Sequence, residues 1–207
     1  MPVRADMTKA RLQYGAVAQA FHWLTGVLIV IAFTYGPGGS EQRVYSAARD
    51  FDRQLHETLG FCLLALILLR LLWRLIDTRP EPEPVARWMH VTSRLMQWAL
   101  YLMMLALPIT AICGAWLEGH PLTLLGGLRF APQVAPSHDL GATIAEIHGW
   151  LGDAILWLAG FHALAAIYHH IFLKDGVLMS MLPRWFPLAR LFPAAQSSRP
   201  PSEDASA

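Results

Sequence analysis

The sequence predicts an all-α membrane protein, a four-helix transmembrane bundle with both termini in the cytoplasm. Three observations predict it. Of the 207 residues, 55% are hydrophobic and only 15% are charged, whereas a soluble domain has about 25% charged residues. Four apolar segments each approach or exceed the ~20 residues with which a helix crosses about 30 Å of hydrocarbon. Twelve Lys and Arg residues fall on one side of these segments and four on the other, and the richer side is normally cytoplasmic.

The first predicted span covers residues 16–35. No charged residue occurs anywhere in the stretch 12–40. Basic residues precede the span, as they do in a signal peptide, but its length and the internal His22 favour a retained helix over a cleaved leader.

The second and third predicted spans cover residues 55–76 and 95–117. Arg70 and Arg74 fall in the last turns of the second span, where long side chains can reach the membrane interface. The connection between the two spans, TRPEPEPVARW, is too rich in proline to continue a helix. We therefore expect a hinge there, on the cytoplasmic side.

The fourth predicted span covers residues 147–173 and follows a long outer connection with scattered Pro and Gly. After it, VLMSMLPRWFPLARLF is expected to lie along the inner membrane surface, broken by its two prolines. The tail, residues 185–207, has a composition typical of disorder. The sequence thus predicts one helical domain over residues 12–184, followed by a cytoplasmic tail.

Several site classes find no support in the composition. The formal net charge is +1 and there is no basic stripe, so nothing indicates nucleic-acid binding. Cys62 and Cys113 both lie in apolar runs and form neither a CxxC nor a CxxCH pattern. An iron–sulfur cluster, covalently attached c-type haem and a disulfide framework are therefore not indicated.

Four histidines lie inside the predicted spans at matching depths. His22 belongs to the cytoplasmic half of the first span, and His56 opens the second span on the outer side. His148 lies near the outer end of the fourth span, and His162 follows after fourteen residues. That spacing places His162 about 21 Å deeper and within ~40° of the same helix face. The spacing predicts two imidazole pairs, one near each membrane surface.

Two facing neutral imidazoles are the axial ligands of a six-coordinate b-type haem, and helix bundles often build such sites. A small residue stands four positions after each histidine, on the same helix face, where a flat porphyrin needs room; these residues are Gly26, Gly60, Gly152 and Ala166. Zinc would instead require four ligands converging at one point. A histidine proton relay remains an alternative that leaves the small residues unexplained, and any one histidine alone could simply bond a neighbouring carbonyl.

These residues carry a resemblance to a known family. AQAFHWLTG, RQLHETLGF and EIHGWLGDAILWLAGFHALAAIYHHIFLKDGVLMSMLPR, together with the four-span layout, resemble the bacterial cytochrome b561 family of di-haem inner-membrane proteins. The resemblance covers about residues 12–184. It implies two b-type haems, with His22 and His162 as axial ligands of the cytoplasmic haem and His56 and His148 as those of the outer haem.

The resemblance extends to members that act as superoxide oxidases. It implies an enzyme of the bacterial inner membrane that takes electrons from superoxide at the outer face, releases oxygen and passes the electrons to ubiquinone. A non-catalytic carrier linking a quinone pool to a cytochrome, dehydrogenase or hydrogenase partner is the alternative, and a haem-free membrane module is a third. The outer connections carry a negative sum of charges, which does not favour an anionic substrate.

Four further residues are candidates for contacts with quinone or haem propionates. His169 follows His162 by seven residues and could relay a proton to a quinone carbonyl; a propionate or a lipid headgroup is an equal alternative. Lys174 is expected to anchor at the inner interface, or else to meet a propionate or the quinone. Arg70 and Arg74 have the same two interpretations, as anchors or as propionate partners. His170 is expected at the interface, and His90, His120 and His138 fall outside the spans and show no ligand pairing.

Overall fold

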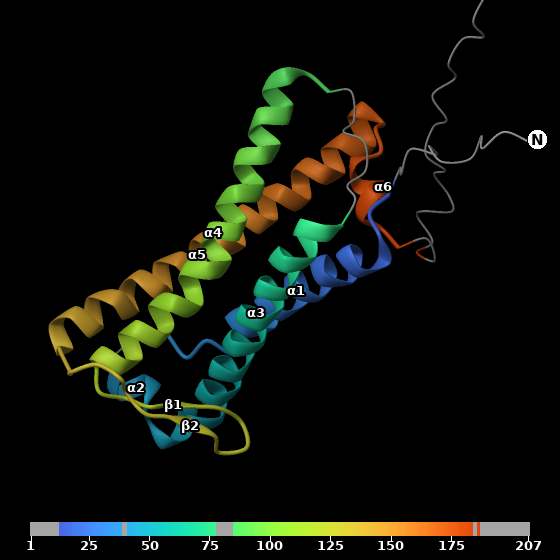
Figure 1. The fold of residues 1–207 in the computed structure, drawn as a ribbon. Coiled ribbons are helices and arrows are strands. Elements are labelled where there is room, and N and C mark those ends of the chain that lie inside the picture. Colours follow the sequence, from blue (N-terminus) through green and yellow to red (C-terminus); the bar gives the residue numbers. More distant parts are fainter. Residues whose placement is uncertain (1–12, 39–40, 78–84, 184–185, 187–207) are drawn as a thin grey trace, which may run out of the picture.

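A computed structural model describes residues 13–38, 41–77, 85–183 and 186. Within these residues the chain is mostly helical, and four helices are long and apolar enough to cross a membrane (Figure 1). The long helices are α1 (Ala16–Thr34), α3 (Asp50–Ile76), α4 (Arg87–Leu117) and α5 (His138–Tyr168). The short elements are α2 (Glu41–Val44), η1 (Ala47–Arg49), β1 (Leu122–Thr123), β2 (Arg129–Phe130), the π-helical turn η2 (His169–Leu173) and α6 (Val177–Met181).

The helices run beyond the apolar stretches from which the spans were predicted. Helix α4 begins at Arg87 rather than at residue 95, and α5 begins at His138 rather than at residue 147. Hydropathy detects only the part of a helix that can lie in hydrocarbon, whereas backbone hydrogen bonding continues into the polar interface. His90 and His138 therefore belong to helices, in turns outside the predicted spans.

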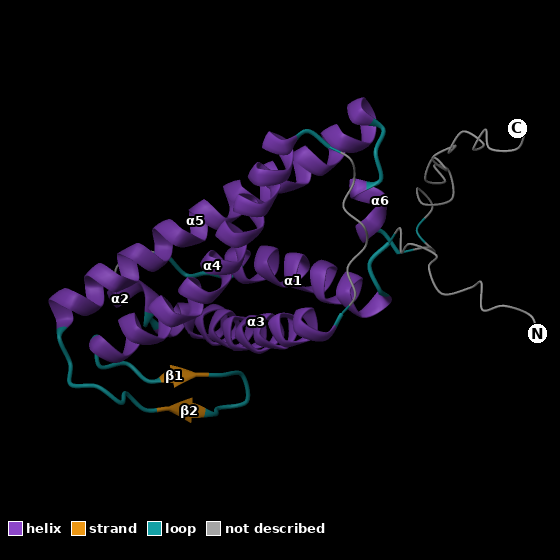
Figure 2. Ribbon diagram, turned by 45° about the horizontal axis from the view of Figure 1, so that its top comes forward, coloured by secondary structure: helices purple, strands orange, loops and turns teal. Residues whose placement is uncertain are grey.

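The long helices pack in two pairs, α1 with α3 and α4 with α5 (Figure 1, Figure 2). Glycines allow α4 and α5 to approach closely at one end. A Cβ atom added at Gly114 would lie 3.3 Å from the backbone nitrogen of Ala145, and one added at Gly141 would lie 2.9 Å from that of Glu118. Backbone approach through small residues is a common way of joining helices in a membrane, where burial of apolar surface offers little drive.

A two-stranded hairpin covers the end of α3. Strands β1 and β2 pair antiparallel, with Leu122 opposite Phe130. The side chain of Glu57 accepts a hydrogen bond from the backbone N–H of Thr123, and Thr58 Oγ1 accepts one from Leu125 N at 2.9 Å. The long connection before α5 is therefore held on α3 by side chains next to His56.

The opposite end of the bundle is closed by α6. The Gln19 amide of α1 donates hydrogen bonds to the carbonyl oxygens of Ser180 and Leu182, both at 3.2 Å. Trp23 Nε1 donates to Met181 O at 2.9 Å. The start of α1 and the segment after α5 consequently lie together at one end (Figure 2). Its cytoplasmic location remains a prediction, and the predicted disordered tail lies outside the described residues except for Phe186.

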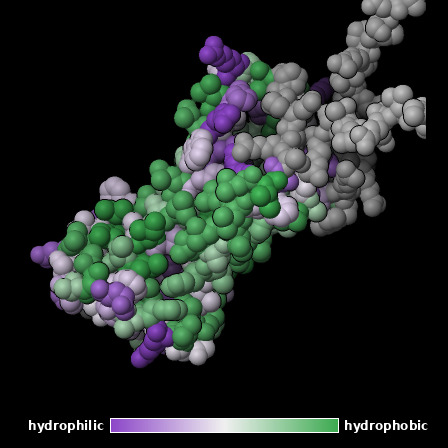
Figure 3. Space-filling model, viewed as in Figure 1, coloured by the Kyte–Doolittle hydropathy of each residue, from purple (hydrophilic) through white to green (hydrophobic). Residues whose placement is uncertain are grey.

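The surface distribution of side chains is that of a protein surrounded by lipid. Apolar residues cover the middle of the molecule and hydrophilic residues gather toward its ends (Figure 3). Leu75, Trp150 and Phe172 are each about 70–80% exposed, whereas few side chains, such as Ile67, are fully buried. A soluble monomer rarely exposes so large a continuous apolar surface to water. The structure thus has the exterior expected of a multi-pass membrane protein.

Candidate functional site

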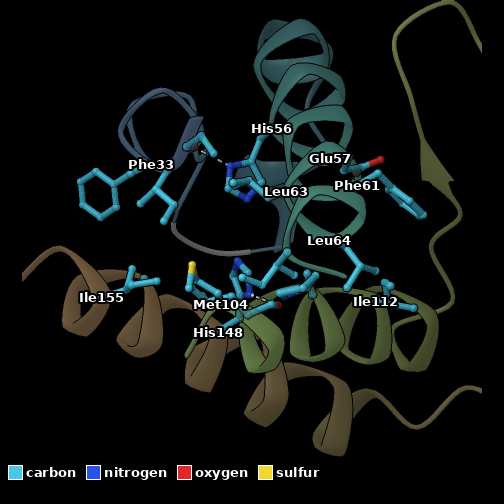
Figure 4. A pocket seen from close by; sticks show the side chains of 18 of the residues that line it. Phe33, His56, Glu57, Phe61, Leu63, Leu64, Met104, Ile112, His148 and Ile155 are labelled. Atoms are coloured by element: carbon cyan, nitrogen blue, oxygen red, sulfur yellow. Dashed lines mark hydrogen bonds between the residues drawn. The ribbon is translucent and has the colours of Figure 1, made fainter. Parts of the chain in front are cut away.

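The structure brings the imidazole rings of His56 and His148 close together. His56 projects from α3 and His148 from α5, across a cavity between the two helix pairs (Figure 4). Their ring centroids are 6.0 Å apart and the ring planes are inclined by 89°. Leu64, Ile67 and other apolar side chains make up most of the cavity wall. Two imidazoles therefore meet in a largely apolar cavity.

Backbone carbonyls determine which nitrogen of each ring carries the proton. His56 Nδ1 lies 2.7 Å from Ala32 O, and His148 Nδ1 lies 2.9 Å from Leu107 O. A carbonyl oxygen only accepts, so each Nδ1 must carry a proton and donate it. The Nε2 atom of each neutral ring then keeps a free lone pair. This is the arrangement typical of metal-binding histidines, whose second nitrogen is fixed by a backbone or carboxylate oxygen.

The ring separation distinguishes a direct bond from a bridging atom. Metal–imidazole bonds are ~2 Å long and ring atoms lie ~1.1 Å from the centroid, so two imidazoles on one metal ion have centroids ~6.2 Å apart. A direct N–H···N hydrogen bond of ~2.9 Å would bring the centroids to ~5 Å. The observed 6.0 Å fits one metal atom between the rings.

A second imidazole pair occupies the other half of the bundle. His22 on α1 and His162 on α5 have ring centroids 6.2 Å apart, inclined by 68°. Here the Nδ1 atom of His22 faces the guanidinium of Arg70 at 3.4 Å, a long contact, rather than a carbonyl. Arg70 and Arg74 both lie over the ring of Tyr101. The second pair has the same spacing as the first but a more positive surrounding.

The glycines that follow the histidines leave open space. A Cβ atom added at Gly26, Gly60 or Gly152 would meet no atom within 4 Å. Gly149 and Gly160 are equally open, so open space alone does not identify a site. Gly60 and Gly152, however, line the same cavity as His56 and His148. The His56–His148 pair therefore stands in a recess with room for a flat group, and its residues fit a haem.

The structure brings the histidines together in pairs and not in larger clusters. Within the described residues, no group of three or more His, Cys, Asp or Glu side chains converges to form a metal site. His120 stacks on Tyr45 with ring centroids 3.5 Å apart. His90 and His138 lie in the first turns of α4 and α5, away from both pairs.

Carboxylates bind Arg49 and Arg53, the two arginines that shortly precede His56 in the sequence. Arg53 bonds to Glu57 at 2.8 Å and also to Asp50, and Arg49 lies 3.0 Å from Asp52. Glu57 itself lines the histidine cavity. Arg49 and Arg53 therefore provide little net positive charge beside the histidine cavity.

The π-helical turn after α5 gives His169 a partner that the sequence did not indicate. His169 Nδ1 lies 2.5 Å from Asp175 Oδ2, and both side chains are largely buried. Asp175 Oδ1 also accepts a hydrogen bond from Val177 N at 3.1 Å. Lys174, between them, has a left-handed backbone with φ of 53°, which reverses the chain. An α-helical extrapolation from His162 would have missed this contact, since it depends on the π turn and the reversal.

Comparison with known proteins gives one consistent family. The family model described as prokaryotic cytochrome b561 matches residues 13–184. Cytochrome b561 homolog 2 of Escherichia coli (strain K12) is 28% identical over 178 residues, which cover 86% of this chain and 95% of that protein. The probable superoxide oxidase CybB of Yersinia pestis is 30% identical, covering 83% and 97%. Cytochrome b561 homolog 1 of E. coli is 32% identical, covering 79% and 93%.

Proposed function

Because the chain belongs to the prokaryotic cytochrome b561 family, whose members are multi-pass membrane electron-transfer proteins with b-type haem, we propose that it moves electrons across the bilayer between two haems. His56 and His148 hold the outer haem, and His22 and His162 hold the inner one. The observation that carries the proposal is the spacing of both imidazole pairs, 6.0 and 6.2 Å between centroids, which fits one metal atom each.

The side chains and backbone contribute position and electrostatics. Each bound haem supplies a one-electron iron couple. The bonds from His56 and His148 to backbone carbonyls hold both rings in one orientation and keep Nε2 available. Hydrogen bonds of this kind raise the basicity of a ligating imidazole and so favour the oxidised metal. Arg70, near the inner pair, places positive charge where an added electron is favoured.

We further propose superoxide as the electron donor and ubiquinone as the acceptor. Two superoxide ions would each lose one electron and leave as oxygen, and one ubiquinone would take up both electrons and two protons. The support is the overall similarity to the Yersinia protein named as a probable superoxide oxidase. It is also the distribution of the two imidazole pairs along α5, which allows an entry haem and an exit haem at opposite surfaces.

The acceptor end of this path is assigned to the π turn. His169 and Lys174 lie next to each other where α5 ends, and the Asp175 carboxylate fixes the orientation of His169. An imidazole held in this way can donate from its other nitrogen to a quinone carbonyl and be reprotonated from water. The propionate alternative for His169 and Lys174 makes the same residues anchors of the inner haem.

A non-catalytic carrier is the second candidate, and one observation favours it. Arg49 and Arg53, the arginines nearest to the outer pair in sequence, are bound to carboxylates. An anionic radical is drawn by net positive potential, which these two residues do not provide. A protein partner docking on the outer face would not need it.

Rapid mixing of the purified, oxidised protein with superoxide separates the two candidates. Superoxide oxidase activity predicts haem reduction at near-diffusive rates, and reoxidation when ubiquinone is added. The His148→Ala variant should lose the fast phase because it lacks the entry haem. If dithionite reduces the haems but superoxide leaves them oxidised, the carrier function replaces the enzymatic one. If the purified protein shows no b-type absorption bands, both fail.

A further inference from the structure

A groove separates α3 from α4 near the C-terminal end of α3 and the N-terminal end of α4. It has a volume of about 530 Å³ and takes one face from each helix. Its principal lining residues are Leu68, Leu72, Leu75 and Arg74 on α3 and Arg94 and Trp98 on α4. Leu68, Leu72 and Leu75 recur at intervals of four and three residues and form one stripe on α3, and Arg94 and Trp98 share a face of α4. Arg74 lies beside the α3 stripe and reaches the groove over Tyr101.

The groove is separate from the histidine cavity. Leu68 and Leu72 follow His56 by twelve and sixteen residues, which places them ~120° and ~160° around the axis of α3 from the imidazole face. None of the residues that line the groove also lines the cavity between His56 and His148. A haem held by that pair would not fill it.

The walls of the groove are apolar and open to the surroundings. Leu72 is 60% exposed, Leu75 81% and Trp98 64%. In a helix that crosses a membrane, such side chains contact lipid chains. The groove is therefore a depression in the lipid-facing surface, wide enough to hold a hydrocarbon chain between two helices.

Two cations stand at the rim of this depression. Arg74 is two residues from the end of α3 and Arg94 seven residues from the start of α4, whereas Leu68 lies ~9 Å deeper along α3 than Arg74. Arg74 Nη1 donates a hydrogen bond to the hydroxyl of Tyr101 at 3.3 Å. In the parts of the chain that the structure describes, neither arginine forms an ion pair with a carboxylate. The groove thus combines an apolar floor with a positive rim.

We propose that this groove binds one anionic phospholipid of the surrounding bilayer. The phosphate lies between the guanidinium groups of Arg74 and Arg94, and one acyl chain lies along Leu68 and Leu72. Arginine pairs with phosphate through parallel N–H···O bonds, and basic pockets between transmembrane helices are suited to acidic headgroups. A quinone also has a long apolar tail, but its neutral ring would leave two cations without an anion.

Native mass spectrometry of the haem-loaded protein tests the site. The protein, delipidated in neutral detergent, is titrated with phosphatidylglycerol and with phosphatidylcholine of the same acyl chains. We expect phosphatidylglycerol to bind about 25-fold more tightly, because each of the two arginines near the surface contributes roughly fivefold. Arg94→Gln should reduce that preference about fivefold. Arg87→Gln, which removes a charge from the same helix two turns outside the groove, should leave it unchanged.

A second variant tests the position of the acyl chain. Leu72→Trp fills the groove from an exposed position, and we expect it to weaken phosphatidylglycerol binding several-fold with unaltered haem absorption. Equal binding of the two lipids, or wild-type binding by Arg94→Gln, overturns the headgroup site. Wild-type binding by Leu72→Trp overturns the acyl-chain position, and displacement of the lipid by ubiquinone assigns the groove to quinone instead.

Discussion

At the scale of single residues, the atoms around each imidazole determine its role. His56 and His148 donate from Nδ1 to main-chain carbonyls of α1 and α4, so each ring is held by a helix other than its own. Among the residues that the structure describes, His22 Nδ1 meets no such carbonyl and faces Arg70 instead. The two pairs therefore have the same spacing but different electrostatic surroundings, which would give two haems different reduction potentials.

The pairing of the histidines predicts which variants share a defect. We expect His56→Ala and His148→Ala each to lose the same haem and to retain the other, because one axial ligand cannot hold the iron in a six-coordinate site. Redox titration of the α band checks this, with His22→Ala as the matched variant that should lose the opposite haem. Loss of different haems in His56→Ala and His148→Ala would show that the pairs are wrongly assigned.

The contact between His169 and Asp175 predicts an effect on the quinone side alone. Asp175→Asn keeps the size of the side chain but removes the carboxylate that orients the imidazole. We expect quinone reduction to slow by about 100-fold, the lower end of what a positioned proton donor contributes, while haem reduction from the donor side stays at the wild-type rate. Stopped-flow traces with and without quinone measure both steps.

Asp175→Glu serves as the conservative control for that variant. It restores the charge and should recover much of the quinone step. An Asp175→Asn variant that reduces quinone at the wild-type rate would remove His169 from the acceptor site. One that instead loses a haem would favour the propionate alternative.

At the scale of helices and strands, close backbone contact joins α4 to α5. Gly141 packs against the end of α4, where an added Cβ atom would lie 2.9 Å from the backbone nitrogen of Glu118. Gly149 is eight residues further along α5 and has nothing within 4 Å of the same position. Two glycines on one helix thus differ in what surrounds them, although the sequence around them gives no sign of it.

This difference predicts opposite responses to the same substitution. Gly141→Ala should lower the stability of the folded protein by about 1–3 kcal/mol, because the main chain of α4 must move to admit the methyl group. Gly149→Ala should be neutral or stabilising by up to ~1 kcal/mol, since alanine favours a helix. Thermal unfolding followed by haem absorption measures both. Equal loss in the two variants would contradict the close packing of α4 on α5.

At the scale of the whole molecule, the sequence was sufficient for the four-helix architecture, because apolar segments of bilayer length leave few alternatives. The histidine motifs within those segments were sufficient for the family. It also placed His22 with His162 and His56 with His148, since depth and helical period are both readable from spacing. The partners Ala32, Leu107 and Asp175 were not predictable. Main-chain carbonyls carry no sequence signal, and the Asp175 contact depends on a π turn that no helical period anticipates.

The two imidazole pairs lie between the helix pairs, so haems bound to them would connect parts of the fold. His56 and His148 connect α3 to α5, and His22 and His162 connect α1 to α5. We expect protein expressed without haem to unfold about 10 °C lower, because a group that binds only the folded state stabilises it. Adding haemin to that protein should restore the midpoint. An unchanged midpoint without haem would show that helix packing alone holds the two pairs together.

Because His148 and His162 lie on one continuous helix, the number of residues between them determines the distance and the angle between their side chains. Inserting a single residue there would turn one imidazole by ~100° and shift it by ~1.5 Å relative to the other, so no small change of length preserves both sites. Elsewhere, as in the hairpin or the tail, residues can be gained or lost without altering this spacing. We therefore expect related chains to differ in the lengths of their connections but to keep the interval of fourteen residues found here.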